Sequence, residues 1–388
     1  MPVIRVLHII DGFGAGGAET WLLSTVKYLK LHPELDMEFD FLATGGEPRI
    51  FDEQIQKLGS RIHYFKYSFK KGLQFRKFIR KILKDKHYDV IHDHQDFISG
   101  WHFIFALGSL PAIRIAHLHN PYNFIHNYVV NPGRWISFRV GRIITAILAT
   151  KITGTSNAVM DEYGYNKWPY KIKRINPAYC GFDIAAFRFN ANSRKTLRKN
   201  FGWDESICKL CLFVGRIGLH DYDKALNQKN PLFAFAIAKK LIEQHSEWRF
   251  LFVGFKGKLG NEMEVEIENK GQSDKIKFVG IRSDVADIMY GSDILIFPSF
   301  WEGLGMVAVE AQANGLPIIM SDTVPVEAVV CHEILTIKKI EEGEQAWVNS
   351  IAESSKMKTD RLIYNTRVGL SPFSIEKSIE NLKLIYSY

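Results

Sequence analysis

The stretch DILIFPSFWEGLGMVAVEAQANGLPIIMSDTVP (293–325) decides the fold of its half of the chain. Its apolar run DILIFPS (293–299) is typical of a buried strand, and MVAVEAQAN (306–314) is apolar at helical spacing. A glycine-flanked loop joins them, and the free N–H groups of a helix start suit a phosphate. Glu302 lies in this loop and Glu310 eight residues later in the helix, which is roughly 12 Å along a helix axis. The pair predicts two carboxylates that hold the hydroxyl groups of a nucleotide's sugar parts.

Strands and helices alternate through both halves of the chain. With 388 residues, of which 46% are hydrophobic, the chain can bury two cores. The βαβα order predicts an α/β fold with parallel sheets covered on both faces. A Pro/Gly-bearing crossing at 175–189 separates the halves. We therefore expect domains at 1–180 and 181–370, and an amphipathic C-terminal helix within 371–388.

Three further segments that follow or flank predicted strand–loop–helix units carry polar or glycine residues. LFVGRIG (212–218) contains Gly215 and Arg216, QKNP (228–231) contains Lys229, and FVGIRSDV (278–285) contains Arg282. Together with Glu302 and Glu310, these motifs resemble the retaining GT-B glycosyltransferases of glycosyltransferase family four. The resemblance extends over nearly the whole chain and includes Gly16-Gly17-Ala18-Glu19, which matches a Gly-Gly-x-Glu motif of that family.

The resemblance implies an architecture and a reaction. The fold would be GT-B, with two Rossmann-like, doubly wound domains facing across a cleft, and the last helix would pack back on the N-terminal domain. The enzyme would move a hexose-type sugar, with retention of configuration, from a nucleoside-diphosphate sugar, with UDP favoured by family frequency. The acceptor would be a glycan or a polyprenyl-pyrophosphate-linked sugar of a bacterial exopolysaccharide. The family needs no metal or other cofactor, because Arg and Lys neutralise the diphosphate.

The resemblance also implies residue roles. Arg216 and Lys229 would grip the diphosphate, Glu302 the sugar and Glu310 the ribose, while His119 would orient the sugar from the other domain. Catalytic candidates are His119, Arg216, Lys229 and Glu302; further donor contacts are Gly16, Gly17, Arg282, Gly303, Leu304, Gly305, Met306 and Glu310. The loop between Arg216 and Lys229 is longer than the family typically has, so Lys224 is an alternative phosphate ligand.

Seven of the thirteen histidines lie between residues 87 and 126. His92 and His94, like His117 and His119, are alternate residues that share a strand face, which keeps a metallohydrolase open as an alternative. The resemblance instead implies a site without metal and makes His117 structural. Acceptor candidates are Glu19, Asp93, His94, Asp96 and Asn123; Arg134, Arg139 and Arg142 follow and could hold a pyrophosphate.

Gly12-Phe-Gly14-Ala-Gly16-Gly17 also fits a dinucleotide-binding loop. An NAD(P)-dependent oxidoreductase is therefore a second alternative, although the stronger nucleotide-type loops lie in the other half. A nucleotide-sugar epimerase and a non-catalytic partner subunit share the architecture and stay open as well.

The net charge of +8 is unevenly distributed. Residues 1–180 contain 24 Lys and Arg against 15 Asp and Glu. Residues 64–86 combine nine Lys and Arg with an apolar stripe at helical spacing, which fits either a solvated helix over the core or a basic surface that meets an anionic membrane. We expect no nucleic-acid partner. Cys208 and Cys211 read as strand filling, and the absence of a signal peptide or spanning segment predicts a cytoplasmic enzyme, at the inner face of the membrane if the basic surface binds it.

Overall fold

The computed structural model describes residues 3–14, 16–124, 132–167, 169–188, 190, 192–204, 208–218, 227–357 and 360–387. The chain divides into two compact units. Unit 1 contains the residues up to Phe182 together with those from Pro372 onward, and unit 2 contains Asp183–Ser371. Within the described residues, no helix is both long enough and apolar enough to cross a membrane.

Unit 1 is built on a parallel six-stranded sheet with the order β3-β2-β1-β4-β5-β6. Its strands are β1 (Ile4–Ile10), β2 (Met37–Ala43), β3 (Ile62–Tyr64), β4 (Val90–Asp93), β5 (Ile113–Leu118) and β6 (Lys151–Gly154). Its helices are α1 (Gly17–Leu31), α2 (Asp52–Lys57), α3 (Gly72–Asp85), α4 (Ile98–Ala106), α6 (Pro132–Leu148), α7 (Asn157–Glu162) and α15 (Ile375–Tyr386). The winding of the chain reverses between β1 and β4, the point at which such sheets bind ligands.

One face of this sheet is covered by α3, α4 and α6. The apolar stripe of α3, made of Phe75, Ile79, Ile82 and Leu83, is buried in the same core as Leu7 of β1. This stripe therefore stabilises the core, and the outward side of α3 is mostly basic, with Leu73, Gln74 and Asp85 also exposed. This packing agrees with the first of the two interpretations of residues 64–86, a solvated helix over the core.

The opposite face is covered by α1 and α15, which contact each other. Trp21 of α1 donates its indole N–H to the hydroxyl of Ser378 on α15 at 2.9 Å. Ser374 begins α15 by accepting a hydrogen bond from the backbone N–H of Lys377. The expected C-terminal helix is thus part of unit 1, and it begins four residues later than 371 because Ser374 caps it.

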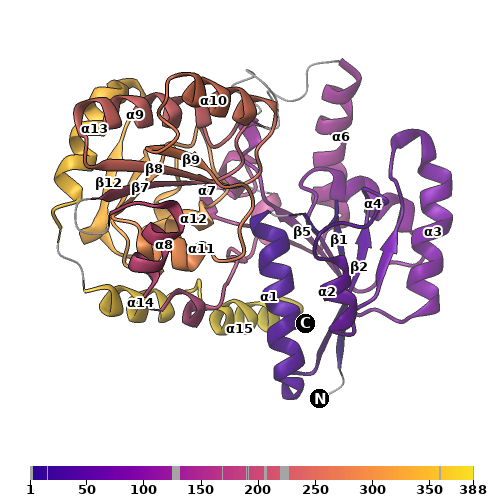
Figure 1. Ribbon diagram of the computed structural model, residues 1–388. Coiled ribbons are helices and arrows are strands. Elements are labelled where there is room, and N and C mark those ends of the chain that lie inside the picture. Colours follow the sequence, from indigo (N-terminus) through magenta and orange to yellow (C-terminus); the bar gives the residue numbers. More distant parts are fainter. Residues whose placement is uncertain are drawn as a thin grey trace. The chain divides into compact units, whose positions relative to one another are not determined.

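Unit 2 repeats this topology in a second parallel six-stranded sheet with the order β12-β11-β10-β7-β8-β9. Its strands are β7 (Lys209–Val214), β8 (Trp248–Val253), β9 (Ile276–Phe278), β10 (Ile294–Phe297), β11 (Ile318–Ser321) and β12 (Leu335–Lys338). Its helices are α8 (Ser193–Phe201), α9 (Pro231–Gln244), α10 (Lys258–Asn269), α11 (Val285–Gly291), α12 (Met306–Ala313), α13 (Gly343–Ser354) and α14 (Arg361–Gly369). Figure 1 shows α9, α10 and α13 on one side of the sheet and α8, α11 and α12 on the other. The predicted α/β fold with two doubly wound parallel sheets is confirmed.

Two local features complete the comparison with the sequence. β12 is missing from the sequence analysis because it is only four residues long and only partly buried, so it gives no apolar run. Cys208 and Cys211 are buried and free; Cys211 lies within β7 and Cys208 immediately precedes it. They fill the core as the sequence indicates.

Candidate active site

The loop that follows β10 positions Glu302. The carbonyl of Ser299 accepts hydrogen bonds from the hydroxyls of Ser321 and Thr323, each at 2.6 Å, which ties the end of β10 to the end of β11. Gly305 then adopts a φ of +93° immediately before α12. A Cβ at this position would lie 2.9 Å from Cγ1 of Val324, so both the backbone conformation and the space require glycine. The loop therefore delivers the chain from a buried strand to a helix start with Glu302 in between.

Glu302 lies in a polar cluster drawn from three segments of unit 2. Its side chain is almost fully buried, and Oε1 accepts an ion-paired hydrogen bond from Nζ of Lys229 at 2.7 Å. Oε2 accepts from the amide of Gln228 at 3.0 Å. Arg216 reaches the same amide, with Nη2 at 3.4 Å from Oε1 of Gln228. The structure thus brings Arg216, Lys229 and Glu302 together at the carboxyl ends of β7 and β10, where the sheet of unit 2 changes its winding.

Lys229 is held in place by its surroundings. Its Nζ lies 4.6 Å above the ring of Phe297, and its side chain runs so close to Gly215 that a Cβ there would be 2.8 Å from Cγ of Lys229. Gly215 is therefore the residue that allows the lysine to lie beside β7. Lys224, the alternative phosphate ligand, lies outside the described residues.

Glu310 lies on α12 and is partly buried. Burial raises the pKa of its carboxyl to about 7, while the nearby Lys229 pulls the pKa in the opposite direction. The carboxyl is therefore substantially protonated at neutral pH in the protein without ligand. Gly303, Leu304 and Met306 lie between the two glutamates, and α12 begins at Met306 with the free N–H groups of a helix start.

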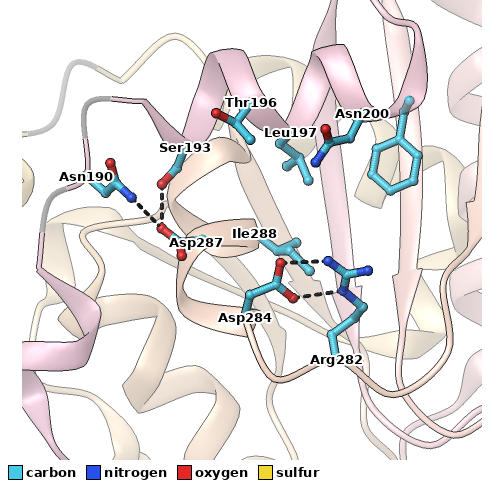
Figure 2. Close-up of a pocket in the computed structure, with 10 residues that line it drawn as sticks. Asn190, Ser193, Thr196, Leu197, Asn200, Arg282, Asp284, Asp287 and Ile288 are labelled. Atoms are coloured by element: carbon cyan, nitrogen blue, oxygen red, sulfur yellow. Dashed lines mark hydrogen bonds and ion pairs between the residues drawn. The ribbon is translucent and has the colours of Figure 1, made fainter.

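Arg282 occupies a different environment. Its guanidinium makes a two-point ion pair with Asp284, with hydrogen bonds of 2.8 and 2.7 Å. Figure 2 shows this pair among residues of α8 and α11 that line a pocket, including Asn200 and Asp287. The volume of this pocket is about 290 Å³. Within the described residues, no hydrogen bond or ion pair connects Arg282 to Arg216, Lys229 or Glu302. The structure does not bring Arg282 together with the cluster, and its predicted donor contact stays a prediction.

In unit 1, Gly16 is the residue before α1, and Gly17 begins that helix. A side chain at position 16 would collide with the carboxylate of Glu19 one turn later, so glycine leaves room for Glu19 to reach back over the helix start. Asn123, another of the acceptor candidates, is exposed, and its backbone N–H donates a hydrogen bond to the carboxylate of Glu162 at 3.3 Å.

Asp93 and Asp96 differ sharply in what they contact. Asp93 is fully buried, and its oxygens accept hydrogen bonds from Ser99 at 2.9 Å and His102 at 2.7 Å, both on α4. This geometry gives Asp93 a structural role, and we do not retain it as an acceptor ligand. Asp96, in a left-handed conformation with φ of +50°, accepts from the backbone N–H of His119 at 2.7 Å and fixes the loop after β5. Burial raises the pKa of Asp96 to about 6.

Five histidines of β1, β4, β5 and the loops after β4 and β5 lie on the sheet face that α1 and α15 cover. His8 bonds through Nδ1 to Nε2 of His94 at 2.9 Å, and His94 bonds through Nδ1 to Nε2 of His119 at 3.0 Å. A second chain runs from the hydroxyl of Tyr386 on α15 to His92, at 2.7 Å, and on to His117, at 3.1 Å. The sequence analysis missed His8, although its parallel register with His92 follows from aligning the two strands.

These imidazoles are neutral at neutral pH. Burial lowers the pKa of His8 to about 3 and that of His119 to about 4, and it lowers the pKa of His92, His94 and His117 well below the ordinary value. A neutral imidazole has one N–H and one acceptor nitrogen.

The first chain has a preferred direction. Nε2 of His8 is buried and bonds to no described residue. Because buried N–H groups are rarely left unpaired, we assign the proton of His8 to Nδ1. His94 then donates from Nδ1 to His119, which leaves His119 with an N–H at Nδ1, a donor for a ligand hydroxyl.

Two sets of these nitrogens, one from His8, His92 and His94 and one from His94, His117 and His119, lie within 4.8 Å of one another and could hold a metal ion. Most of the same nitrogens already bond to each other, and the rings of His117 and His119 are stacked at 4.1 Å. A metal would have to break these hydrogen bonds in order to bind.

Comparison with known proteins extends over both units. Residues 15–185 match the family Glycosyltransferase Family 4, and residues 209–368 match the family Glycosyl transferases group 1. The capsular polysaccharide biosynthesis glycosyltransferase CapH of Staphylococcus aureus is 27% identical over 390 residues, which cover 99% of each protein. The glycosyltransferase EpsF of Bacillus subtilis is 26% identical over 353 residues, 90% of this chain and 88% of that protein.

Solved structures show the same fold. HepE of Anabaena, in complex with UDP and glucose, has a TM-score of 0.74 at 17% identity over 98% of both chains. WaaG, a glycosyltransferase involved in lipopolysaccharide biosynthesis, has a TM-score of 0.71 at 15% identity over 99% of this chain and 100% of that chain. The paired sheets, the two family matches and the relatives agree: this chain belongs to the GT-B glycosyltransferases of family four.

Proposed function

We propose that this glycosyltransferase moves a hexose-type sugar from a UDP-sugar to a glycan or polyprenyl-pyrophosphate-linked acceptor, with retention of configuration, in the synthesis of a bacterial surface polysaccharide. CapH, a capsule glycosyltransferase, supports the polysaccharide, and HepE, a neighbour with UDP and glucose bound, supports the donor. Retention and the acceptor are what the family resemblance of the motifs implies, and the cytoplasmic location rests on the composition of the sequence.

The observation that carries the proposal is the cluster of Arg216, Lys229 and Glu302. Two cations and one carboxylate meet beside a helix start at the switch point of the sheet of unit 2. Such a site can take a diphosphate on its cations and N–H groups and a sugar hydroxyl on its carboxylate. Glu310, inside α12, is the proposed ligand of the ribose hydroxyls.

The proposed chemistry is electrostatic. As the bond between the sugar and the diphosphate breaks, negative charge grows on the leaving phosphate, and Arg216 and Lys229 stabilise it. The leaving phosphate itself takes the proton of the acceptor hydroxyl on the same face of the sugar, so no protein base is needed. We assign His119 the task of orienting the sugar by donating a hydrogen bond from its Nδ1–H to a sugar hydroxyl.

We further propose that the reaction needs no metal, since the two cations neutralise the diphosphate. EDTA should then leave the rate unchanged. A strict requirement for a divalent cation would overturn this part of the proposal and would direct attention to the histidine chains.

The experiment that tests the function has two steps. A thermal-shift screen with UDP-, GDP- and ADP-sugars and with NAD(P) identifies the ligand class, and stabilisation by NAD(P) alone would contradict a transferase. Arg216→Ala and Glu302→Ala should then abolish transfer while the circular dichroism spectrum stays native. The exposed Lys258→Ala is the matched control and should keep the wild-type rate. Near-normal turnover of either site variant would refute the site.

A further inference from the structure

Helix α6 presents an apolar stripe to solvent. Ile136, Val140, Ile143 and Ile147 follow each other at spacings of four, three and four residues, and they are 55, 37, 49 and 65% exposed. At 3.6 residues per turn these four side chains lie on one side of the helix. We call them the α6 stripe.

The other side of α6 is fixed against the core, so the stripe cannot turn inward. Phe138 and Thr145 are fully buried. Gly141 packs so closely against α4 that a Cβ on Gly100 would lie 2.5 Å from the carbonyl oxygen of Gly141. Rotation of α6 about its axis would break this close contact between Gly100 and Gly141. The packing therefore fixes the side of α6 on which the stripe lies.

The surroundings of the stripe are basic. α6 contains Arg134, Arg139 and Arg142 and no Asp or Glu. Arg139 lies 4.9 Å over the ring of Trp135, which is 42% exposed at the start of the helix. An indole and a guanidinium beside an aliphatic stripe are the side chains found where a protein meets the boundary between lipid headgroups and acyl chains.

A second segment extends the surface. Nζ of Lys173 donates to the carbonyls of Ala146 and Ile147 at 2.9 Å each, which fastens residues 170–173 to the end of α6. Ile172 in this segment is 80% exposed, and its neighbour Lys171 is exposed as well. The apolar stripe and its positive flank thus continue past the end of the helix.

We infer that the α6 stripe, with Ile172, is a membrane-docking surface that lies in the plane of an anionic bilayer, with the aliphatic side chains among the acyl chains and the arginines at the phosphates. Charge complementarity selects this occupant, because a surface that combines aliphatic side chains with arginines and has no acid on α6 matches anionic headgroups. α3 does not offer the same surface, since four of its apolar residues are buried in the core. Among the described residues of that helix, Leu73, which is 78% exposed, is the one exposed large apolar side chain. The inference concerns binding and does not depend on the proposed transfer reaction.

Flotation of the full-length protein with vesicles tests this assignment. The wild type should float with phosphatidylethanolamine–phosphatidylglycerol vesicles and should largely stay behind with phosphatidylcholine vesicles. Ile143→Glu/Ile147→Glu should lower the partition coefficient by about tenfold or more, because burial of each isoleucine side chain is lost. Leu73→Glu/Gln74→Glu on α3 is the matched control: it adds the same two negative charges at two exposed positions and should leave flotation unchanged.

Three results would overturn the inference. The first is a wild-type protein that does not float with anionic vesicles, and the second is a double variant that floats like the wild type. The third is a wild type that sediments as a dimer without lipid while the double variant sediments as a monomer, because a second copy of the chain would then cover the stripe. The thermal midpoints of the variants are measured alongside, and since all substituted side chains are exposed they should stay close to that of the wild type.

Discussion

Glu310 offers a quantitative test of the site that is independent of any activity assay. Burial raises the pKa of its carboxyl from an ordinary value of 4.5 to about 7. Between these pH values the folded protein holds a proton that the unfolded chain has released, so the stability linked to this proton is fully present below pH 4.5 and is lost as the pH rises through 7. At 1.36 kcal/mol per pKa unit, the loss between pH 5 and pH 8 amounts to about 2.5 kcal/mol.

Glu310→Gln removes this dependence because an amide does not ionise. Relative to the wild type, the variant should therefore gain about 2.5 kcal/mol of unfolding free energy between pH 5 and pH 8. For a unit of this size the gain corresponds to a relative rise in thermal midpoint of about 5 to 10 °C, measured by scanning calorimetry at the two pH values. The same variant should lose UDP-sugar affinity, since an ionised carboxylate is the better acceptor for ribose hydroxyls.

Other titrating groups are common to both proteins and cancel in the comparison. Glu268→Gln, at an exposed position on α10, is the matched control and should parallel the wild type at both pH values. If the difference between Glu310→Gln and the wild type is the same at pH 5 and pH 8, then the carboxyl titrates normally and the reasoning about its burial is wrong.

Three further predictions concern other residues of the Glu302 cluster and of the histidine chains. Lys229→Met should abolish transfer and destabilise the protein by about 3 kcal/mol, because it leaves the buried Glu302 without its cation. In urea unfolding, the double variant Lys229→Met/Glu302→Gln should recover this stability, but it should not recover the activity. His94→Leu should cut kcat by roughly tenfold with the fold retained, because the hydrogen bond from His94 no longer holds the proton of His119 on Nδ1. An unchanged ¹⁵N imidazole spectrum of His119 would contradict the proposed chain of hydrogen bonds from His8 to His119. Gly305→Ala should cost about 1–3 kcal/mol in calorimetry, owing to its left-handed φ and the short contact that a Cβ would make; a variant as stable as the wild type would show that the loop has other conformations available.

The sequence predicts most of what depends on chain-local patterns. The strands β7 and β10 are continuous apolar runs, and Arg216, Lys229 and Glu302 follow such runs or precede a helix, so their common location at one sheet edge can be expected from parallel topology alone. Glu310 is different. Its place on α12 is predictable, but its raised pKa depends on the burial that residues distant in the sequence provide.

The failures have equally physical reasons. Asp93 precedes His94 by one residue, and since successive strand side chains alternate, the two point to opposite faces of the sheet; treating them as one set overlooked this period. His8 was missed because a single histidine in an apolar strand has no local signal, and only the register of β1 with β4 places it beside His92. The apolar stripe on α6 has the same helical period as the apolar stripe on α3. From the sequence alone it is not possible to tell which of these two stripes is buried against the core and which is exposed to solvent.

The last helix has a consequence for how the protein is made. α15 supplies unit 1 with the Tyr386 hydroxyl for His92 and with the carbonyl of Ile385 for Lys151, which donates to it at 2.7 Å. A ribosome releases unit 2 in full before it releases α15, so unit 2 can complete its fold while unit 1, although synthesised first, still exposes the sheet face that α15 covers. Unit 1 can therefore complete its fold only after unit 2 has been synthesised, and the histidine face of β1, β4 and β5 lacks its α15 cover until the final turns of α15 emerge.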